Sequence, residues 1–234
     1  MKSNVSRRHF LGAAGISAAS LGAVSAMAAE GTATDSKLKI VAVACSLRQG
    51  KTTAQGLSFC LQAAKEVAPD RIEIELIELA GLKIPAELAL GMPLEEGQTD
   101  DFPSVAEKLA DPAVGAILIG SPVYFSNMTA LCKAFIDRCG MFRMKNFALS
   151  GKVAGVLSVG GARSGGQEVV IQSIQAALFC HEMIVVGDGR PTSRFGACLW
   201  NQGDDVSNDE IGVSAAKNLG RHVAEVALAR HASA

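Results

Sequence analysis

The sequence has few of the features that mark several common classes of site. Its 234 residues include one Trp and one Tyr, and aromatic residues make up only 5% of the chain. The formal net charge is −1 and the body of the chain contains no block of basic residues, which argues against a nucleic-acid partner. The sequence shows no internal repeat and no internal domain boundary. These absences leave a single domain of ordinary globular composition.

Cysteines are present but lack the spacing of a metal or redox motif. The chain contains no CxxC pair, and no set of cysteines has metal-ligand spacing, so the sequence predicts no metal site. Several cysteines fall inside apolar patterns, where a free thiol behaves as a small hydrophobic group. An oxidising compartment would permit disulfides, but the sequence cannot pair the six residues: Cys45, Cys60, Cys132, Cys139, Cys180 and Cys198.

The first 28 residues have the pattern of an export signal. Arg7 and Arg8 precede a weakly apolar run rich in Ala, Gly and Ser, and Ala26-Met27-Ala28 supplies a small-residue cleavage pattern. The paired arginines indicate the twin-arginine route, so residues 1–28 are expected to be a signal peptide and the protein periplasmic. The alternative is an N-terminal membrane anchor. Because this route carries folded proteins, it favours a cofactor that is bound tightly before export.

The stretch 114–138 indicates the fold. Val114 to Ile119 is a short apolar run rich in β-branched residues, which is typical of a fully buried strand. It stops at Gly120-Ser121-Pro122, and apolar residues then return with helical spacing as far as Arg138. A buried strand, a turn and an amphipathic helix place that turn at the carboxyl edge of a parallel sheet, where ligands bind in open α/β folds.

The remaining chain repeats this alternation over residues 37–230. Strands are expected at 37–44, 71–79, 114–120, 151–159 and 183–186, with helices at 53–67, 102–110, 128–139, 167–179 and 208–229. Residues 187–207 are expected to form an irregular loop because they are rich in Gly. Five strands that alternate with five helices predict an α/β, three-layer, flavodoxin-like sandwich with a five-stranded parallel sheet in the order 2-1-3-4-5.

The first loop at this edge, residues 46–53, has the composition of an anion site. Hydroxyl groups and a helix N-terminus meet there, and Arg48 and Lys51 add positive charge. The alternative is a solvated turn that only caps the helix. Gly50-Lys51-Thr52 also suggests a nucleotide triphosphatase, but that motif requires Gly at position 45, where this chain has Cys45.

Two further loops follow the third and fourth strands. Residues 121–127 contain the adjacent aromatic pair Tyr124-Phe125, which suits a planar ring system, although Phe125 could instead pack in the core. Residues 160–166 contain four glycines, which let the backbone approach a ligand closely, and Arg163 is placed to cover a phosphate or a ring edge.

These three motifs together resemble the NADPH-dependent FMN reductase and iron–sulfur flavoprotein family of flavodoxin-like proteins. The similarity extends over about residues 38–190. The resemblance implies FMN as the cofactor and a homodimer or homotetramer that completes the flavin site across an interface. It also implies that the first loop holds the phosphate and that the other two border the ring and ribityl chain, through Ser46, Arg48, Lys51, Thr52, Thr53, Pro122, Val123, Tyr124, Phe125, Asn127, Gly160, Gly161 and Arg163.

Two departures from that family shape the expected function. The connection over residues 80–101 has no cysteine, so we expect no iron–sulfur cluster, since a [4Fe–4S] cluster needs four thiolates. The export signal places the protein in the periplasm, whereas NADPH is a cytoplasmic reductant. The sequence therefore predicts an exported FMN oxidoreductase that passes electrons from NAD(P)H or a redox partner to a quinone, flavin or other acceptor. We expect no side chain to act as a catalytic acid or base. The alternatives are an electron carrier without turnover and a protein that binds nothing.

Overall fold

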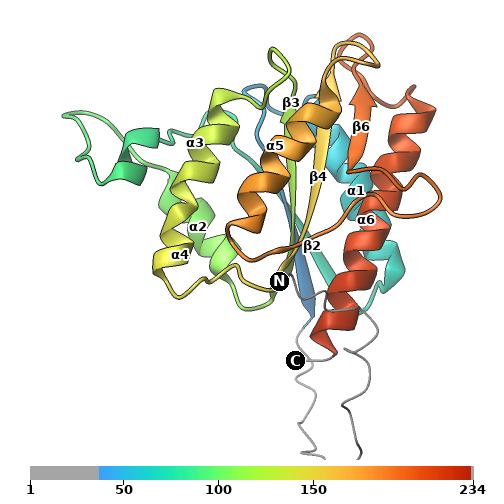
Figure 1. Cartoon of the computed structure of the whole chain (residues 1–234), viewed down its shortest axis with the longest axis horizontal. Helices are drawn as coiled ribbons and strands as arrows, with labels where there is room; N and C mark the ends of the chain where they lie inside the picture. Colours follow the sequence, from blue (N-terminus) through green and yellow to red (C-terminus); the bar gives the residue numbers. More distant parts are fainter. Residues whose placement is uncertain (1–36, 233–234) are drawn as a thin grey trace, which may run out of the picture. The chain divides into compact units, whose positions relative to one another are not determined.

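The sheet is centred on β3 (Val114–Pro122), whose residues from Ala116 to Ser121 are buried between two helical layers (Figure 1). The computed structural model describes residues 37–232, and the predicted signal peptide at 1–28 lies outside them. β1 (Leu38–Ala44) pairs with β3 on one side and with β2 (Ile72–Glu78) on the other. β2 alternates apolar and charged residues, as expected for an edge strand with one solvated face.

All strand pairs in this sheet are parallel. β4 (Val153–Gly160) lies beside β3, and β5 (Ile184–Val185) pairs with the first two residues of β4. The resulting order, β2-β1-β3-β4-β5, confirms the predicted flavodoxin-like topology. Because the strands are parallel, the loops that follow β1, β3 and β4 emerge at the same edge.

A sixth strand corrects the prediction that residues 187–207 form an irregular loop. β6 (Ala197–Trp200) pairs in parallel with the second half of β4, which the two-residue β5 leaves without a neighbour. Ala197 and Leu199 are buried while the residues between and after them are not, so the strand has the expected period of two. Gly196 permits this pairing, because a Cβ atom there would lie 2.3 Å from the carbonyl oxygen of Val156.

The helices bury the two faces of the sheet separately. α1 (Thr52–Val67) and α6 (Glu210–His231) cover one face, and α2 (Phe102–Ala110), α3 (Ala130–Arg138) and α5 (Gln167–Phe179) cover the other. The sequence predicts one helix ending at Cys139. The structure instead has α3 followed by the short α4 (Gly140–Met144). Within residues 37–232, no helix is long and apolar enough to cross a membrane.

The six cysteines are free in the described chain, and four of them lie in the core. Burial raises the pKa of the Cys60 thiol and, with the nearby Cys132, that of Cys139, so neither is a thiolate at neutral pH. Burial also raises the pKa of Cys198 to about 11. These cysteines therefore act as small hydrophobic groups.

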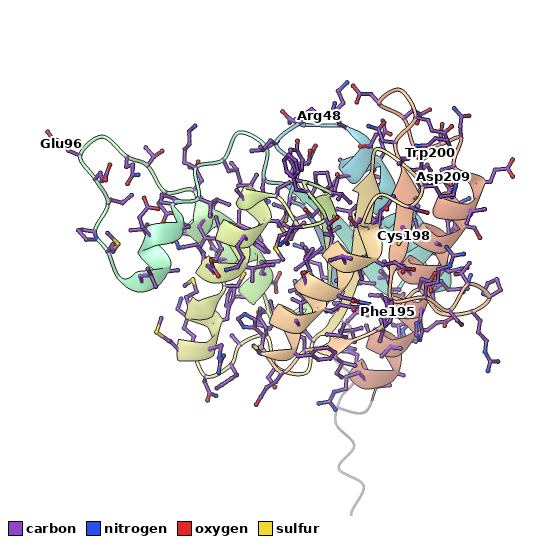
Figure 2. The ribbon with its side chains drawn as sticks, turned by 45° about the horizontal axis from the view of Figure 1, so that its top comes forward. Arg48, Glu96, Phe195, Cys198, Trp200 and Asp209 are labelled. Atoms are coloured by element: carbon purple, nitrogen blue, oxygen red, sulfur yellow. The ribbon has the colours of Figure 1, made fainter. Side chains whose placement is uncertain are left out.

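The connection between β2 and α2 extends away from the sheet (Figure 1) and carries Glu96 near its tip (Figure 2). It contains one 3₁₀ turn, η2 (Ala86–Leu90). Its base is anchored by Arg138, which forms two hydrogen bonds with Asp100, donates to the carbonyl of Pro85 and lies 4.7 Å from the ring centre of Phe102. The side chains of Arg138 and Asp100 are only about a tenth exposed, so this ion pair is shielded from solvent.

Candidate functional site

Three loops meet at the carboxyl edge of the sheet: the first loop (residues 46–53), the second loop (121–127) and the third loop (160–166). Thr129, the N-cap of α3, joins the first two. Its hydroxyl donates at 2.8 Å to the carbonyl of Cys45, which precedes the first loop, and its backbone N–H donates at 3.1 Å to Oγ of Ser121 in the second loop. The second and third loops touch, because a Cβ atom on Gly166 would lie 2.9 Å from Oγ of Ser126. The structure therefore brings the three predicted motifs together.

The first loop turns tightly before α1 begins. The hydroxyl of Ser46 accepts from the backbone N–H of Arg48 at 3.1 Å, and Gly50 has a φ of +64°, which favours glycine. Thr52 and Thr53 are almost fully buried at the start of the helix. Gly120 makes this possible, because a Cβ atom there would lie 2.8 Å from Leu57 and 3.0 Å from Thr53. The start of α1 therefore packs directly against Gly120, near the end of β3.

The N-terminus of α1 has donors that the protein leaves without side-chain partners. Its N-cap, Lys51, makes no side-chain capping bond, and the first turn has no acidic residue. Oγ1 of Thr53 is buried and has no hydrogen-bond partner in the described structure. A buried polar group without a partner is costly. Free backbone N–H groups, an orphaned hydroxyl and a helix dipole form a favourable site for an anion.

Two carboxylates lie against the groups of the first loop. Asp204 accepts a hydrogen bond from Arg48 at 2.6 Å and lies 3.5 Å from Nζ of Lys51. Glu78, at the end of β2, accepts from the backbone N–H of Gly50 at 2.7 Å. Both predicted cations are therefore already paired, which the sequence did not indicate.

The second loop is a tight turn with unusual backbone angles. Tyr124 and Asn127 exchange two backbone hydrogen bonds, of 2.9 and 3.0 Å, and enclose Phe125 and Ser126, whose φ angles are +50° and +57°. Non-glycine residues rarely adopt such angles, and strained backbone is concentrated at functional sites. Phe125 is fully exposed, with a relative accessibility of 102%, so the alternative that it packs in the core is wrong. Pro122 remains within β3, and the backbone N–H of Val123 donates to the carbonyl of Val159.

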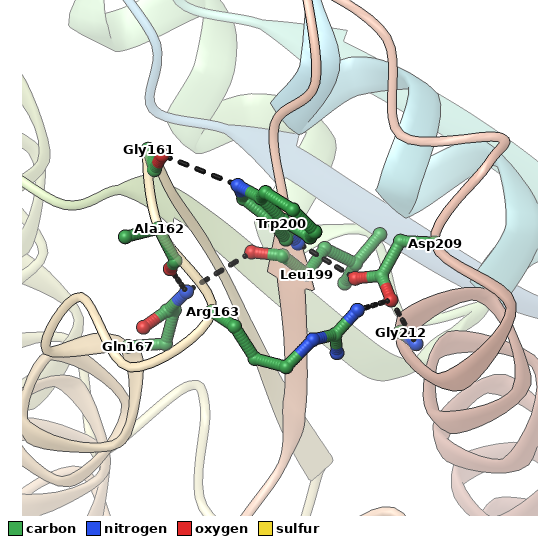
Figure 3. Close-up of polar contacts among 8 residues, drawn as sticks. All are labelled: Gly161, Ala162, Arg163, Gln167, Leu199, Trp200, Asp209 and Gly212. Carbon is green, nitrogen blue, oxygen red and sulfur yellow. Dashed lines mark hydrogen bonds and ion pairs between the residues drawn. The ribbon is translucent and has the colours of Figure 1, made fainter.

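The third loop is held by Gln167, the first residue of α5. Its side-chain amide donates to the carbonyls of Ala162 at 2.6 Å and Leu199 at 3.3 Å (Figure 3). Its side-chain oxygen accepts from the backbone N–H of Gly165 at 2.8 Å. Gly160 allows this contact, because a Cβ atom there would lie 2.4 Å from the amide nitrogen. The indole N–H of Trp200 donates to the carbonyl of Gly161 at 3.2 Å. The loop is therefore positioned by α5 and β6.

Asp209 connects this loop to β6 and α6 (Figure 3). Its buried carboxylate accepts a hydrogen bond from the backbone N–H of Gly212 at 3.1 Å, and this bond caps α6. It also accepts one from the backbone N–H of Trp200 at 2.7 Å. A third hydrogen bond, of 2.7 Å, comes from the guanidinium of Arg163. That guanidinium lies 5.3 Å from the centre of the Trp200 ring. Arg163 therefore points to β6 and α6, whereas the sequence predicts it over a ligand.

We expect this cluster to make stability depend on pH. Burial opposes ionisation of Asp209, but hydrogen bonds from Arg163, Gly212 and Trp200 outweigh it and lower its pKa. Ionised Asp209 therefore stabilises the fold above its unfolded pKa of about 4, and this contribution is lost as pH falls through the lower folded value.

Urea unfolding of wild-type protein and Asp209→Asn between pH 3 and pH 7 measures this effect. The wild type should lose more stability toward low pH than the variant does, and equal losses would show that Asp209 is not responsible. Asp70→Asn is the control, because Asp70 is exposed and its side chain has no hydrogen bond or ion pair among residues 37–232.

The residues that the sequence does not predict are those that hold the three loops in position from other parts of the chain. Thr129 could have been found, because a Thr before a helical pattern is a capping signal. Asp209 gives only the weak signal of an acidic residue at the start of the last predicted helix. Asp204, Glu78 and Trp200 carry no local signal, since their roles depend on which loops lie next to each other.

The three loops offer hydroxyl groups, backbone N–H groups, exposed aromatic rings and three cations, of which Arg163 is bound to Asp209. Among residues 37–232, no group of three or more His, Cys, Asp or Glu side chains is placed to hold a metal ion. This arrangement suits binding of a ligand with an anionic end and a planar end.

Comparison with known proteins gives consistent matches over most of the chain. The NADPH-dependent FMN reductase family model matches residues 38–196. An iron–sulfur flavoprotein of Methanocaldococcus jannaschii is 37% identical over 194 residues, which cover 81% of this chain and 97% of that protein. An NAD(P)H dehydrogenase (quinone) of Aromatoleum aromaticum is 29% identical over 203 residues, which cover 81% and 90%.

A solved structure shares the fold at low sequence identity. The structure of RosB with bound 8-demethyl-8-formylriboflavin-5'-phosphate has a TM-score of 0.64 and 16% identity, and the match covers 82% of this chain and 79% of that one. At this identity the likeness concerns the fold alone.

Proposed function

The chain belongs to the NADPH-dependent FMN reductase family, and we propose that it is an exported enzyme that passes electrons from NAD(P)H or a redox partner, through FMN, to a quinone, flavin or other acceptor. Membership makes it a flavin-dependent oxidoreductase with FMN as its cofactor. The observation that carries the placement of FMN is the uncapped N-terminus of α1 with the orphaned hydroxyl of Thr53 beside it.

The first loop fits the phosphate of FMN. The backbone N–H groups at the start of α1 and the hydroxyls of Ser46, Thr52 and Thr53 would bind its oxygens, and Arg48 and Lys51 would add charge. A phosphate there would supply the acceptor that Thr53 lacks within the protein. A bound phosphate would therefore give the buried hydroxyl of Thr53 a hydrogen-bond partner.

The second and third loops would border the ring and the ribityl chain, through residues 122–127 and 160–163. Bound FMN supplies the hydride and single-electron chemistry, and the protein orients it. Exposed Tyr124 and Phe125 would contact a planar ring, and the backbone of Gly160 and Gly161 would meet its polar rim. No side chain of these loops is assigned a proton-transfer role.

We also propose export, the absence of a cluster and oligomerisation. Residues 1–28 support passage of the folded, FMN-loaded protein to the periplasm, which cell fractionation of wild type and Arg7→Lys/Arg8→Lys would test. The lack of cysteine in residues 80–101 supports a protein without an iron–sulfur cluster, and iron and sulfide analysis would test it. Exposed Phe125 supports a homodimer or homotetramer that covers the site, and light scattering would measure its mass.

The absorption spectrum of the purified protein, with the FMN released per chain, tests the proposal first. We expect the bands of oxidised flavin and about one FMN per chain. A colourless protein that takes up no added FMN would contradict it.

Oxidation of NADH or NADPH by the loaded protein, with a quinone or free flavin as acceptor, then tests turnover. Reduction of the flavin by neither nicotinamide would favour a carrier that exchanges electrons with a protein partner.

A further inference from the structure

Asp204 lies at the point where the phosphate of FMN would need positive charge. Its carboxylate contacts both cations of the first loop, Arg48 at 2.6 Å and Lys51 at 3.5 Å. The side chains of all three residues are between 44% and 49% exposed, so the cluster is open to solvent. The hydrogen bond from Arg48 lowers the pKa of Asp204, which is therefore ionised at neutral pH.

The loop that carries Asp204 keeps its shape through its own contacts. The backbone N–H of Asp204 donates to Oδ1 of Asn201 at 2.8 Å, and that of Gln202 donates to the carbonyl of Asp205 at 2.8 Å. Gly203 and Asp204 both adopt a φ near +66°, which closes the turn. These bonds do not involve the first loop. The carboxylate can therefore leave its two partners without unfolding of the segment that presents it.

We propose that Asp204 competes with the phosphate group of the flavin for Arg48 and Lys51 and so sets how tightly the site holds a phosphorylated flavin. This inference rests on the proposed function. A phosphate dianion and a carboxylate on the same two cations would repel each other, so binding requires Asp204 to withdraw. Ion pairs exposed to solvent are weak, so phosphate can displace the carboxylate.

Glu78 strengthens the case for competition at this loop. Its carboxylate accepts from the backbone N–H of Gly50, a donor that a bound phosphate could also use. The first loop is thus bordered by two carboxylates before any ligand arrives, with Asp204 on its two cations and Glu78 on the backbone N–H of Gly50. A site built only to maximise phosphate affinity would lack these anions. The arrangement suits a site that binds the phosphate of FMN less tightly than its two cations alone would allow.

The test compares Asp204→Asn with wild type by titrating FMN into protein freed of flavin and following flavin fluorescence. Asn keeps the size of Asp and removes its charge. We expect Asp204→Asn to bind FMN at least about threefold more tightly at low ionic strength, with the difference shrinking as salt is added. Affinity for riboflavin, which has no phosphate, should not change.

Asp205→Asn is the matched control, because it removes the same charge from the neighbouring residue, whose carboxylate bonds only within its own loop, to Ser207 and the backbone of Val206. It should leave FMN affinity close to the wild-type value. Equal or weaker FMN binding by Asp204→Asn, or an equal gain for riboflavin, would overturn the role of Asp204. Failure of the wild-type protein to bind FMN at all would instead overturn the proposed function.

Discussion

Replacing Thr52 with aspartate should lower the affinity for FMN by at least about 100-fold, because the new carboxylate would lie where the phosphate binds. Thr52 is the first residue of α1 and is 3% exposed. Two like charges about 4 Å apart repel by about 4 kcal/mol at an effective dielectric constant of 20, and the phosphate carries nearly two charges. Titration with FMN, followed by fluorescence, measures the loss.

Thr52→Asn separates charge from shape in this experiment. Asn has the size of Asp but no charge, so its FMN affinity should stay much closer to wild type. The helix dipole favours an acidic residue in the first turn, but Thr52 is buried and a charge there loses hydration. Thermal unfolding of both variants therefore measures the cost to stability separately from the loss of FMN affinity. Equal FMN affinities for the two variants would remove the first loop from the cofactor site.

Gly220→Ala should lower the free energy of unfolding by about 3 kcal/mol, because it separates the two helices that support the first loop. A Cβ atom on Gly220 in α6 would lie 1.9 Å from the carbonyl oxygen of Cys60 in α1, and that oxygen belongs to a backbone that cannot turn aside. Overpacking of a well-packed core costs about 1–3 kcal/mol and occasionally more. A shift of this size lowers the melting temperature of a domain this long by roughly 6–12 °C.

Gly140→Ala is the matched control for this substitution. Gly140 begins α4, and a Cβ atom there would have no heavy atom within 4 Å. Alanine is favoured over glycine in a helix by about 1 kcal/mol, so this change should leave stability unchanged or raise it. Denaturant unfolding of both variants measures the difference. If Gly220→Ala were as stable as Gly140→Ala, α1 and α6 would not pack as closely as the structure shows.

The sequence predicts the parallel sheet because its signals are local. The apolar run at Val114 and the alternation in β2 each reflect the burial of a strand, and both strands form where expected. β6 was missed because four residues between glycine-rich turns give too short a pattern to recognise. β6 forms because the second half of β4 has an edge that β5 does not pair with. The two segments are 40 residues apart, so neither sequence alone shows that they pair.

The loops of the site show the same division between local and distant causes. Gly50, Gly166 and the turn at Phe125 depend on backbone angles and turn chemistry, which composition indicates. The partners of Arg48 and Arg163 come from residues 156 and 46 positions away. No pattern near either arginine predicts that its charge is already matched by an aspartate.

The sequence by itself determined the order of β1 to β5 and of the helices between them apart from α4, the three loops after β1, β3 and β4, and their likeness to a flavin-binding family. Hydrophobic period and turn composition act over a few residues, so they can be read without a structure. Only the tertiary structure decided that Asp204 faces the first loop, that Asp209 binds Arg163 and that Phe125 is exposed. These are contacts between segments that the sheet and the packing of its helices bring together.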